Sequence, residues 1–184
     1  VHVIIVNTEI PQEEPVKFEG ITLHFLRERY IPIIQNQLPP LRRSWDLAMM
    51  LRRLDRSIGI DVVEIPNDEG LAFFPVLLMR NKTVLRCHTS FRQHVRVKHL
   101  PMTAQRRLTC WLDAAAAQRA KLIITHSQAN ATQIRRDHRL RRSQSVEIIP
   151  HGLPMPDNVS HVRHEVRDET EVRFLFVGWL DKRK

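Results

Sequence analysis

The segment KTVLRCHTSF, residues 82–91, decides how the rest of the chain is interpreted. Its apolar first half predicts a short buried strand, and the hydroxyl pair Thr89 and Ser90 marks the turn that follows. His88 stands where this strand ends. In open parallel α/β sheets, ligands bind in the crevice beyond the carboxyl ends of the strands. His88 is therefore the first candidate for a functional residue.

Strand and helix patterns alternate on both sides of this segment. Strands are predicted at residues 2–6, 20–26, 61–65, 82–86, 121–126 and 146–150, and helices at 44–58, 71–79, 103–120 and 127–138. Such alternation implies right-handed crossovers between parallel strands. The fold class is α/β, a Rossmann-like parallel sheet with helices on both faces.

Local signals predict where these elements begin and end. Ser44 and Ser127 are expected to be helix N-caps, and Gly59 is expected to close the first helix. Residues 7–19 form a proline-bearing acidic loop, prolines keep 32–40 irregular, and 92–101 is expected to be a basic loop.

Composition limits the class of protein. The chain has 184 residues, 42% of them hydrophobic, which suits a soluble globular protein with one core and part of a second. No apolar run reaches the ~20 residues that span a bilayer, and the N-terminus does not resemble a signal peptide. Cys87 and Cys110 fall in a predicted strand and a predicted helix, which indicates reduced, buried thiols. We expect a cytoplasmic protein.

The formal net charge is +9, which is compatible with nucleic acid, phosphorylated substrates or an anionic membrane surface. The arginines come in scattered pairs with almost no aromatic residues among them, whereas nucleic-acid modules interleave the two or concentrate the charge. Solvated helix faces, or contact with anionic lipid at the inner face of the membrane, are the preferred interpretations.

Several familiar site motifs are missing from the sequence. The five glycines form neither a Gly-x-Gly-x-x-Gly fingerprint nor a phosphate-binding lysine loop, and no Gly-x-Ser-x-Gly elbow occurs. The ten histidines show no metal-ligand spacing. We therefore expect no metal ion and no bound cofactor.

Five segments carry a family resemblance in their order and spacing: DVVEIPNDEG (61–70), LRCHTS (85–90), LIITHS (122–127), VEIIPHG (146–152) and FLFVGWL (174–180), the last followed by Lys184. Together they resemble the glycosyltransferases of the two-domain GT-B architecture. The resemblance is to family four, the large retaining group that includes sugar transferases of polysaccharide and cell-envelope synthesis.

The resemblance implies two Rossmann-like domains that face each other across a cleft. Residues 1–154 would be the acceptor-side domain without its first strand, and residues 155–171 an interdomain linker. Residues 172–184 would be the first strand of a truncated donor-binding domain. On this view the chain is a fragment with half an active site, and is inactive by itself.

At the end of the central strand, the resemblance places His88 beside the transferred sugar as the catalytic residue. The alternative is a histidine that caps a buried strand and bonds to backbone. Thr89 and Ser90 are expected to position the acceptor, or else to cap the following turn.

The acidic turn after the preceding strand is a second candidate site. Glu64, Asn67, Glu69 and Gly70 are expected to hold acceptor hydroxyls. The alternative is an ordinary surface turn.

Near the C-terminus, the resemblance assigns donor-diphosphate contacts to Gly178 and Lys184. Trp179 stands where the family usually has arginine, so cationic side chains near Lys184 would supply the charge.

The activity implied is transfer of a sugar from a nucleotide-sugar donor to a sugar or lipid-linked acceptor, with retention at the anomeric carbon. Two alternatives stay open. One is a GT-B-shaped sugar-nucleotide epimerase, which needs no acceptor. The other is a basic α/β nucleic-acid-binding module, which predicts steeply salt-dependent binding.

Overall fold

A computed structural model describes residues 1–6, 14–26 and 39–150 of the chain. The predicted linker at 155–171 and the predicted strand at 172–184 lie outside these residues, and Gly178 and Lys184 with them.

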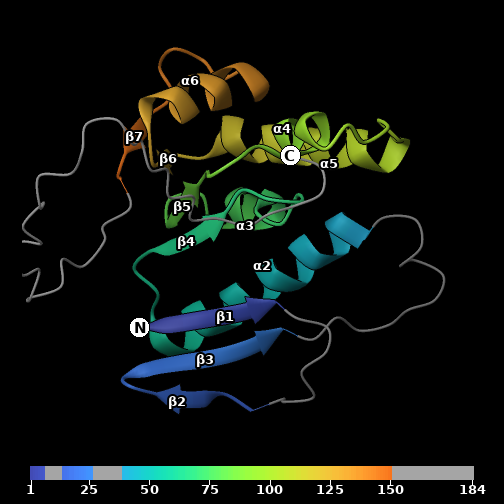
Figure 1. Cartoon of the computed structure of the whole chain (residues 1–184). Helices are drawn as coiled ribbons and strands as arrows, with labels where there is room; N and C mark the ends of the chain where they lie inside the picture. The colour runs from blue at the N-terminus through green and yellow to red at the C-terminus, as the bar shows by residue number, and fades with distance from the viewer. Residues whose placement is uncertain (7–13, 27–38, 151–184) are drawn as a thin grey trace, which may run out of the picture. The chain divides into compact units, whose positions relative to one another are not determined.

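The principal sheet is parallel, as the sequence predicted. Its strands are β4 (Val63–Pro66), β5 (Thr83–Arg86), β6 (Leu122–Thr125) and β7 (Val146–Ile148), hydrogen-bonded in that order (Figure 1). Each strand is a short run rich in β-branched or aliphatic residues. Because all the strands run in one direction, their carboxyl ends lie along one edge of the sheet, which is where a ligand site is expected.

A smaller sheet precedes it in the chain. β1 (His2–Val6) pairs in parallel with β3 (Ile21–Leu26), and β2 (Val16–Phe18) pairs antiparallel with β3. Placing Val16–Phe18 in a loop was therefore wrong. The chain reverses between β2 and β3 through Glu19 and Gly20, whose positive φ angles of 46° and 78° suit a tight hairpin turn. A strand of three residues is too short for an alternating pattern to reveal it.

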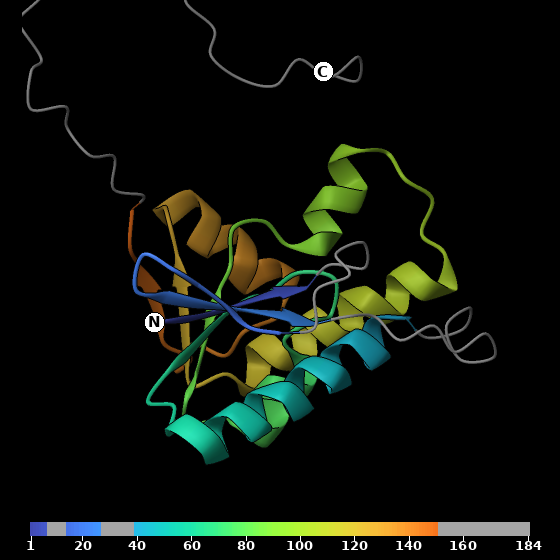
Figure 2. The same cartoon turned by 90° about the horizontal axis from the view of Figure 1, so that it is seen from below.

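Five helices are described: α2 (Pro39–Ile58), α3 (Phe73–Leu78), α4 (Phe91–Val97), α5 (Ala104–Arg119) and α6 (Gln128–Asp137). α2 packs against α3 and α3 packs against α5, so these three lie side by side (Figure 2). The loop between α4 and α5 holds α4 apart from that row (Figure 2).

The first long helix begins earlier than predicted. It starts at Pro39, because a proline in the first helical turn lacks only an N–H that would have no intrahelical acceptor. Ser44 is therefore inside the helix, and its role as N-cap was wrong. Its side chain is fully buried, and its hydroxyl accepts a hydrogen bond from the backbone N–H of Phe74 at 2.9 Å. Ser44 thus fastens α2 to α3.

The basic segment at 92–101 was predicted to be a loop, but most of it is α4. Ser90 caps this helix, since its hydroxyl accepts from the backbone N–H of Gln93. Ser127 caps α6 in the same way through Asn130, as predicted, and Gly59 ends α2 with a φ of 67°.

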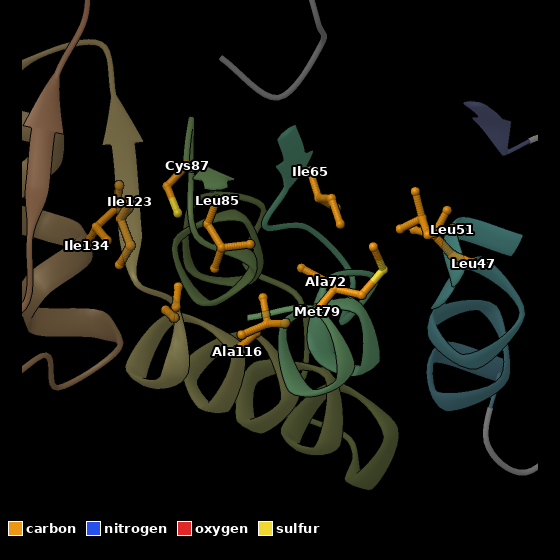
Figure 3. Packing of buried hydrophobic residues seen from close by; sticks show 13 residues of the cluster. Leu47, Leu51, Ile65, Ala72, Met79, Leu85, Cys87, Ala116, Ile123 and Ile134 are labelled. Atoms are coloured by element: carbon orange, nitrogen blue, oxygen red, sulfur yellow. The ribbon is translucent and has the colours of Figure 1, made fainter. Parts of the chain in front are cut away.

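The core lies between the parallel sheet and its helices. Leu85 and Ile123 of the sheet meet Ala116 of α5 and Ile134 of α6, while Leu47 comes from α2 (Figure 3). Burying an aliphatic side chain of this size contributes about 1.5–3 kcal/mol, so the cluster fixes the positions of the strands against the helices.

Successive side chains along β5 point to opposite faces of the sheet, and this alternation determines which of them reach solvent. Leu85 and Cys87 point into the core, with 0% and 2% of their surface exposed. Arg86 and His88 take the opposite side of the strand. The packing of β5 is therefore what presents His88 outward.

Candidate functional site

Two histidines meet beyond the carboxyl ends of neighbouring strands. Arg86 of β5 pairs with Ile124 of β6, so His88 and His126 occupy matching positions two residues further along. Their rings stack with centroids 5.8 Å apart and planes 26° from parallel. His88 is exposed and His126 is half-buried. The structure therefore places His88 at the expected edge, with its ring supported from one side.

A charged pair crosses from β4 to β5 beside these rings. The guanidinium of Arg86 donates through Nε and Nη2 to the two carboxylate oxygens of Glu64, at 2.5 and 2.8 Å. These bonds, followed by the charges of Arg86 and His88, hold the pKa of Glu64 below its ordinary value despite some burial. Glu64 is thus an ionised, solvent-exposed acceptor of hydrogen bonds near His88.

The turn after β4 is held from inside the protein. The carboxylate of Asp113 in α5 accepts a hydrogen bond from the backbone N–H of Gly70 at 2.7 Å. Burial raises the pKa of Asp113 to about 7, although the bond from Gly70 opposes this rise. Gly70 itself is buried. This contact ties the candidate turn to the long helix behind it.

Asn67 faces the same buried region. Its side-chain N–H group donates to the backbone carbonyl of Asp113 at 3.4 Å and approaches Nε2 of His138 at 3.3 Å. Burial lowers the pKa of His138 to about 4, so the ring is neutral and Nε2 can accept. Burial also raises the pKa of the neighbouring Cys87 thiol to about 12. Asn67 thus links the turn to a neutral polar cluster under the sheet edge.

The cluster keeps unused hydrogen-bonding capacity. Within the described part of the chain, Asn67 Oδ1, Asp113 Oδ2 and His138 Nδ1 are buried and have no hydrogen-bond partner. Buried polar atoms of this kind usually bind ordered water. These three atoms are therefore where ordered water is expected in the cluster.

The predicted site residues divide by exposure. Glu64, Glu69, His88 and Thr89 reach solvent, whereas Asn67, Gly70 and Ser90 are buried. Glu69 has a φ of 50° and its carboxylate lies 3.5 Å from the guanidinium of Arg43.

Ser90 belongs to a network with the end of α6. Its hydroxyl donates to Asp137 Oδ2, and the guanidinium of Arg96 approaches Asp137 Oδ1 at 3.1 Å. Burial opposes ionisation of Asp137, but its polar neighbours Gln133, Ser90 and Arg96 outweigh this effect and keep its pKa below the ordinary value. Ser90 therefore anchors the start of α4 directly after His88 and Thr89.

Four polar residues of this region were not predicted: His126, Asp113, Asp137 and His138. A signal existed for two of them. His126 follows its strand just as His88 follows its own, and Asp113 is a lone acid in an apolar, alanine-rich helix. Asp137 and His138 sit at an ordinary helix end, and nothing in the sequence marks them as buried.

Two absences hold for the residues that the structure describes. No three His, Cys, Asp or Glu side chains gather in a way that could hold a metal ion. No described helix has both the length and the apolar character needed to cross a membrane.

Comparison with known proteins gives one match. No curated protein and no solved structure matched the chain. The family model described as Glycosyltransferase Family 4 matches residues 1–155, which include every described strand and helix. The parallel sheet agrees with the Rossmann-like half that this family's GT-B architecture requires. The chain therefore belongs to glycosyltransferase family 4.

Proposed function

We propose that this chain supplies the acceptor side of a transferase that moves a sugar from a nucleotide-sugar donor to a hydroxyl of a sugar or a lipid-linked acceptor, with retention. The observation that carries the proposal is the position of His88 in a family 4 chain. The residue is exposed, lies at the carboxyl edge of the parallel sheet, and stands beside the ionised Glu64.

The exposed side chains of His88 and Glu64 can bind and orient the acceptor in such a reaction. An imidazole at His88 can donate to or accept from a sugar hydroxyl, and the Glu64 carboxylate can accept from a second hydroxyl. Stacking on His126 limits how the His88 ring tilts. Two fixed polar groups at one edge orient a sugar ring, which lowers the entropic cost of reaching the transition state.

In the transfer itself, the bond between the anomeric carbon and the donor phosphate oxygen breaks. A bond from the same carbon to the acceptor oxygen forms, and the acceptor proton leaves with the departing diphosphate. Gly178 and Lys184 are the proposed diphosphate contacts of this chain, without a metal ion. A cation there would balance the charge that develops on the leaving group.

The test uses the natural full-length protein and a set of UDP-, GDP- and ADP-sugars, each with and without candidate acceptors. The proposal predicts nucleoside diphosphate release that requires an acceptor, and a product whose anomeric configuration by NMR equals that of the donor. Conversion of the donor sugar without an acceptor would instead identify an epimerase. Tight, salt-dependent RNA or DNA binding with no reaction on any donor would favour the nucleic-acid module.

A further inference from the structure

A cavity of about 750 Å³ lies between α4 and α5, and none of the predicted site residues lines it. Three guanidinium groups line it, those of Arg92, Arg96 and Arg107. Its remaining wall includes the apolar side chains of Val95, Leu100 and Met102. The cavity therefore combines concentrated positive charge with an apolar surface.

No acidic side chain lines this cavity. The sequence has no Asp or Glu between Glu69 and Asp113, although it has five Arg or Lys residues from Arg92 to Arg107. One acid, Asp137 at the end of α6, forms an ion pair with Arg96. The positive charge of the cavity is thus only partly balanced from within the protein.

The guanidinium groups keep donors available. Arg92 lies near the thiol of Cys110, and Arg96 uses one nitrogen for its bond to Asp137. Within residues 1–6, 14–26 and 39–150, the side chain of Arg107 makes no hydrogen bond or ion pair. Each guanidinium has five N–H donors in a planar fork that matches the oxygens of a phosphate group.

Part of the cavity lining is apolar and reaches solvent. Met102, which lines the cavity, is 41% exposed. Apolar side chains next to arginines are the arrangement of surfaces that contact both the headgroups and the acyl chains of a bilayer. An inorganic anion alone would not contact the apolar side chains of the cavity.

We propose that the α4–α5 cavity binds a phosphate ester that carries an apolar chain, which is the chemistry of an anionic phospholipid. The arginines hold the phosphate, and Leu100 and Met102 contact the chain. The proposal goes beyond sugar transfer and does not depend on it. The network from Arg96 through Asp137 to Ser90 connects this cavity to the end of β5, so a bound lipid would lie close to the segment that carries His88.

The test compares two double variants that lose the same charge. Arg92→Gln with Arg107→Gln removes two cations from the cavity. Arg52→Gln with Arg53→Gln removes two exposed cations from α2, and serves as the control. Binding is measured by co-sedimentation with phosphatidylcholine vesicles with and without phosphatidylglycerol, and by NMR titration with glycerol phosphate. Circular dichroism checks that each variant is folded.

We expect binding to vesicles that contain phosphatidylglycerol, weakened about thirtyfold in the cavity variant and by less than about threefold in the control. Glycerol phosphate should shift resonances of the cavity in the wild type and not in the cavity variant. Met102→Gln should weaken vesicle binding and leave glycerol phosphate binding unchanged.

Other results would overturn the proposal. Equal losses in the two arginine variants would show a general charge effect instead of a site. Cavity-dependent binding of glycerol phosphate without any vesicle binding would assign the cavity to a soluble phosphate ester and contradict the apolar part. Since no nucleotide-sugar is present, these results are independent of whether the protein transfers sugar.

Discussion

The carboxylate of Asp113 lies 2.7 Å from the backbone nitrogen of Gly70 and accepts its hydrogen bond. This contact joins two segments 43 residues apart, the turn after β4 and the middle of α5. It ties the turn that carries Glu69 to α5. The candidate site therefore depends on a buried acid that itself does not reach the surface.

Gly70 is required by both conformation and space. Its φ is +79°, and a Cβ there would lie 3.0 Å from Leu112 Cδ1 and 3.1 Å from Leu112 Cβ. Gly70→Ala should lower the free energy of unfolding by about 2–4 kcal/mol, through backbone strain plus overpacking. The measurement is urea denaturation followed by circular dichroism.

Gly59→Ala is the matched control for this prediction. Gly59 has a φ of +67° but nothing within 4 Å of its added Cβ, so only about 1–2 kcal/mol of strain is expected. Equal losses at the two positions would contradict the close packing of Gly70 on Leu112.

The buried carboxyl group of Asp113 and the buried imidazole of His138 should have opposite effects on how the free energy of unfolding changes with pH. Asp113 has its pKa raised to about 7, so between pH 3.8 and 7 the folded state holds a proton that the unfolded state has lost. Its contribution is therefore fully present below about pH 3.8 and is lost as the pH rises to 7. His138 has its pKa lowered to about 4, so its contribution rises between pH 4 and 6.5.

Single variants separate the two contributions. Relative to wild type, His138→Gln should lose stability as the pH rises from 4 to 6.5, and Asp113→Asn should gain stability as the pH rises from 3.8 to 7. The slopes approach about 1.4 kcal/mol per pH unit at most. Urea denaturation at several pH values measures them. Parallel stability curves for the two variants would refute the assignment of these pKa values.

The two thiols should differ in reactivity. Burial raises the pKa of Cys87 to about 12, and also raises the pKa of Cys110. Cys110, however, lines the α4–α5 cavity. At pH 8, Cys87 should react with iodoacetamide at least about a hundredfold more slowly than a free thiol, and Cys110 should react more slowly than a free thiol but ahead of Cys87. Mass spectrometry of timed digests gives both rates.

Two checks accompany this labelling experiment. In urea, where burial is lost, the two cysteines should react at similar rates. Labelling of Cys87 ahead of Cys110 in the folded protein would contradict the placement of Cys110 at an accessible cavity.

The parallel sheet could be predicted because its strands are short apolar runs with clear polar ends. Thr83–Arg86 and Leu122–Thr125 both fall inside the predicted strands. The smaller elements could not be predicted. Residues 92–101 include many basic residues, which is typical of an exposed loop. α4 nevertheless forms there because Ser90 supplies a cap and Val95 packs into the core.

The position of a candidate residue was predictable where it follows a strand directly. His88 lies where its strand position required, because the carboxyl ends of parallel strands share one edge. The support beneath the site could not be predicted, since Asp113 and His138 come from different helices and meet Asn67 only through tertiary packing. Their burial decides their protonation, and burial is a property of the fold.

Sugar transfer by a His88→Ala variant of the natural full-length protein tests the central claim most directly. The control is His94→Gln, which removes another exposed imidazole, on α4. With an active donor and acceptor pair, the account predicts that His88→Ala lowers kcat by at least about a hundredfold while His94→Gln changes it by less than about twofold. Equal activity of His88→Ala and wild type would contradict a catalytic role for His88.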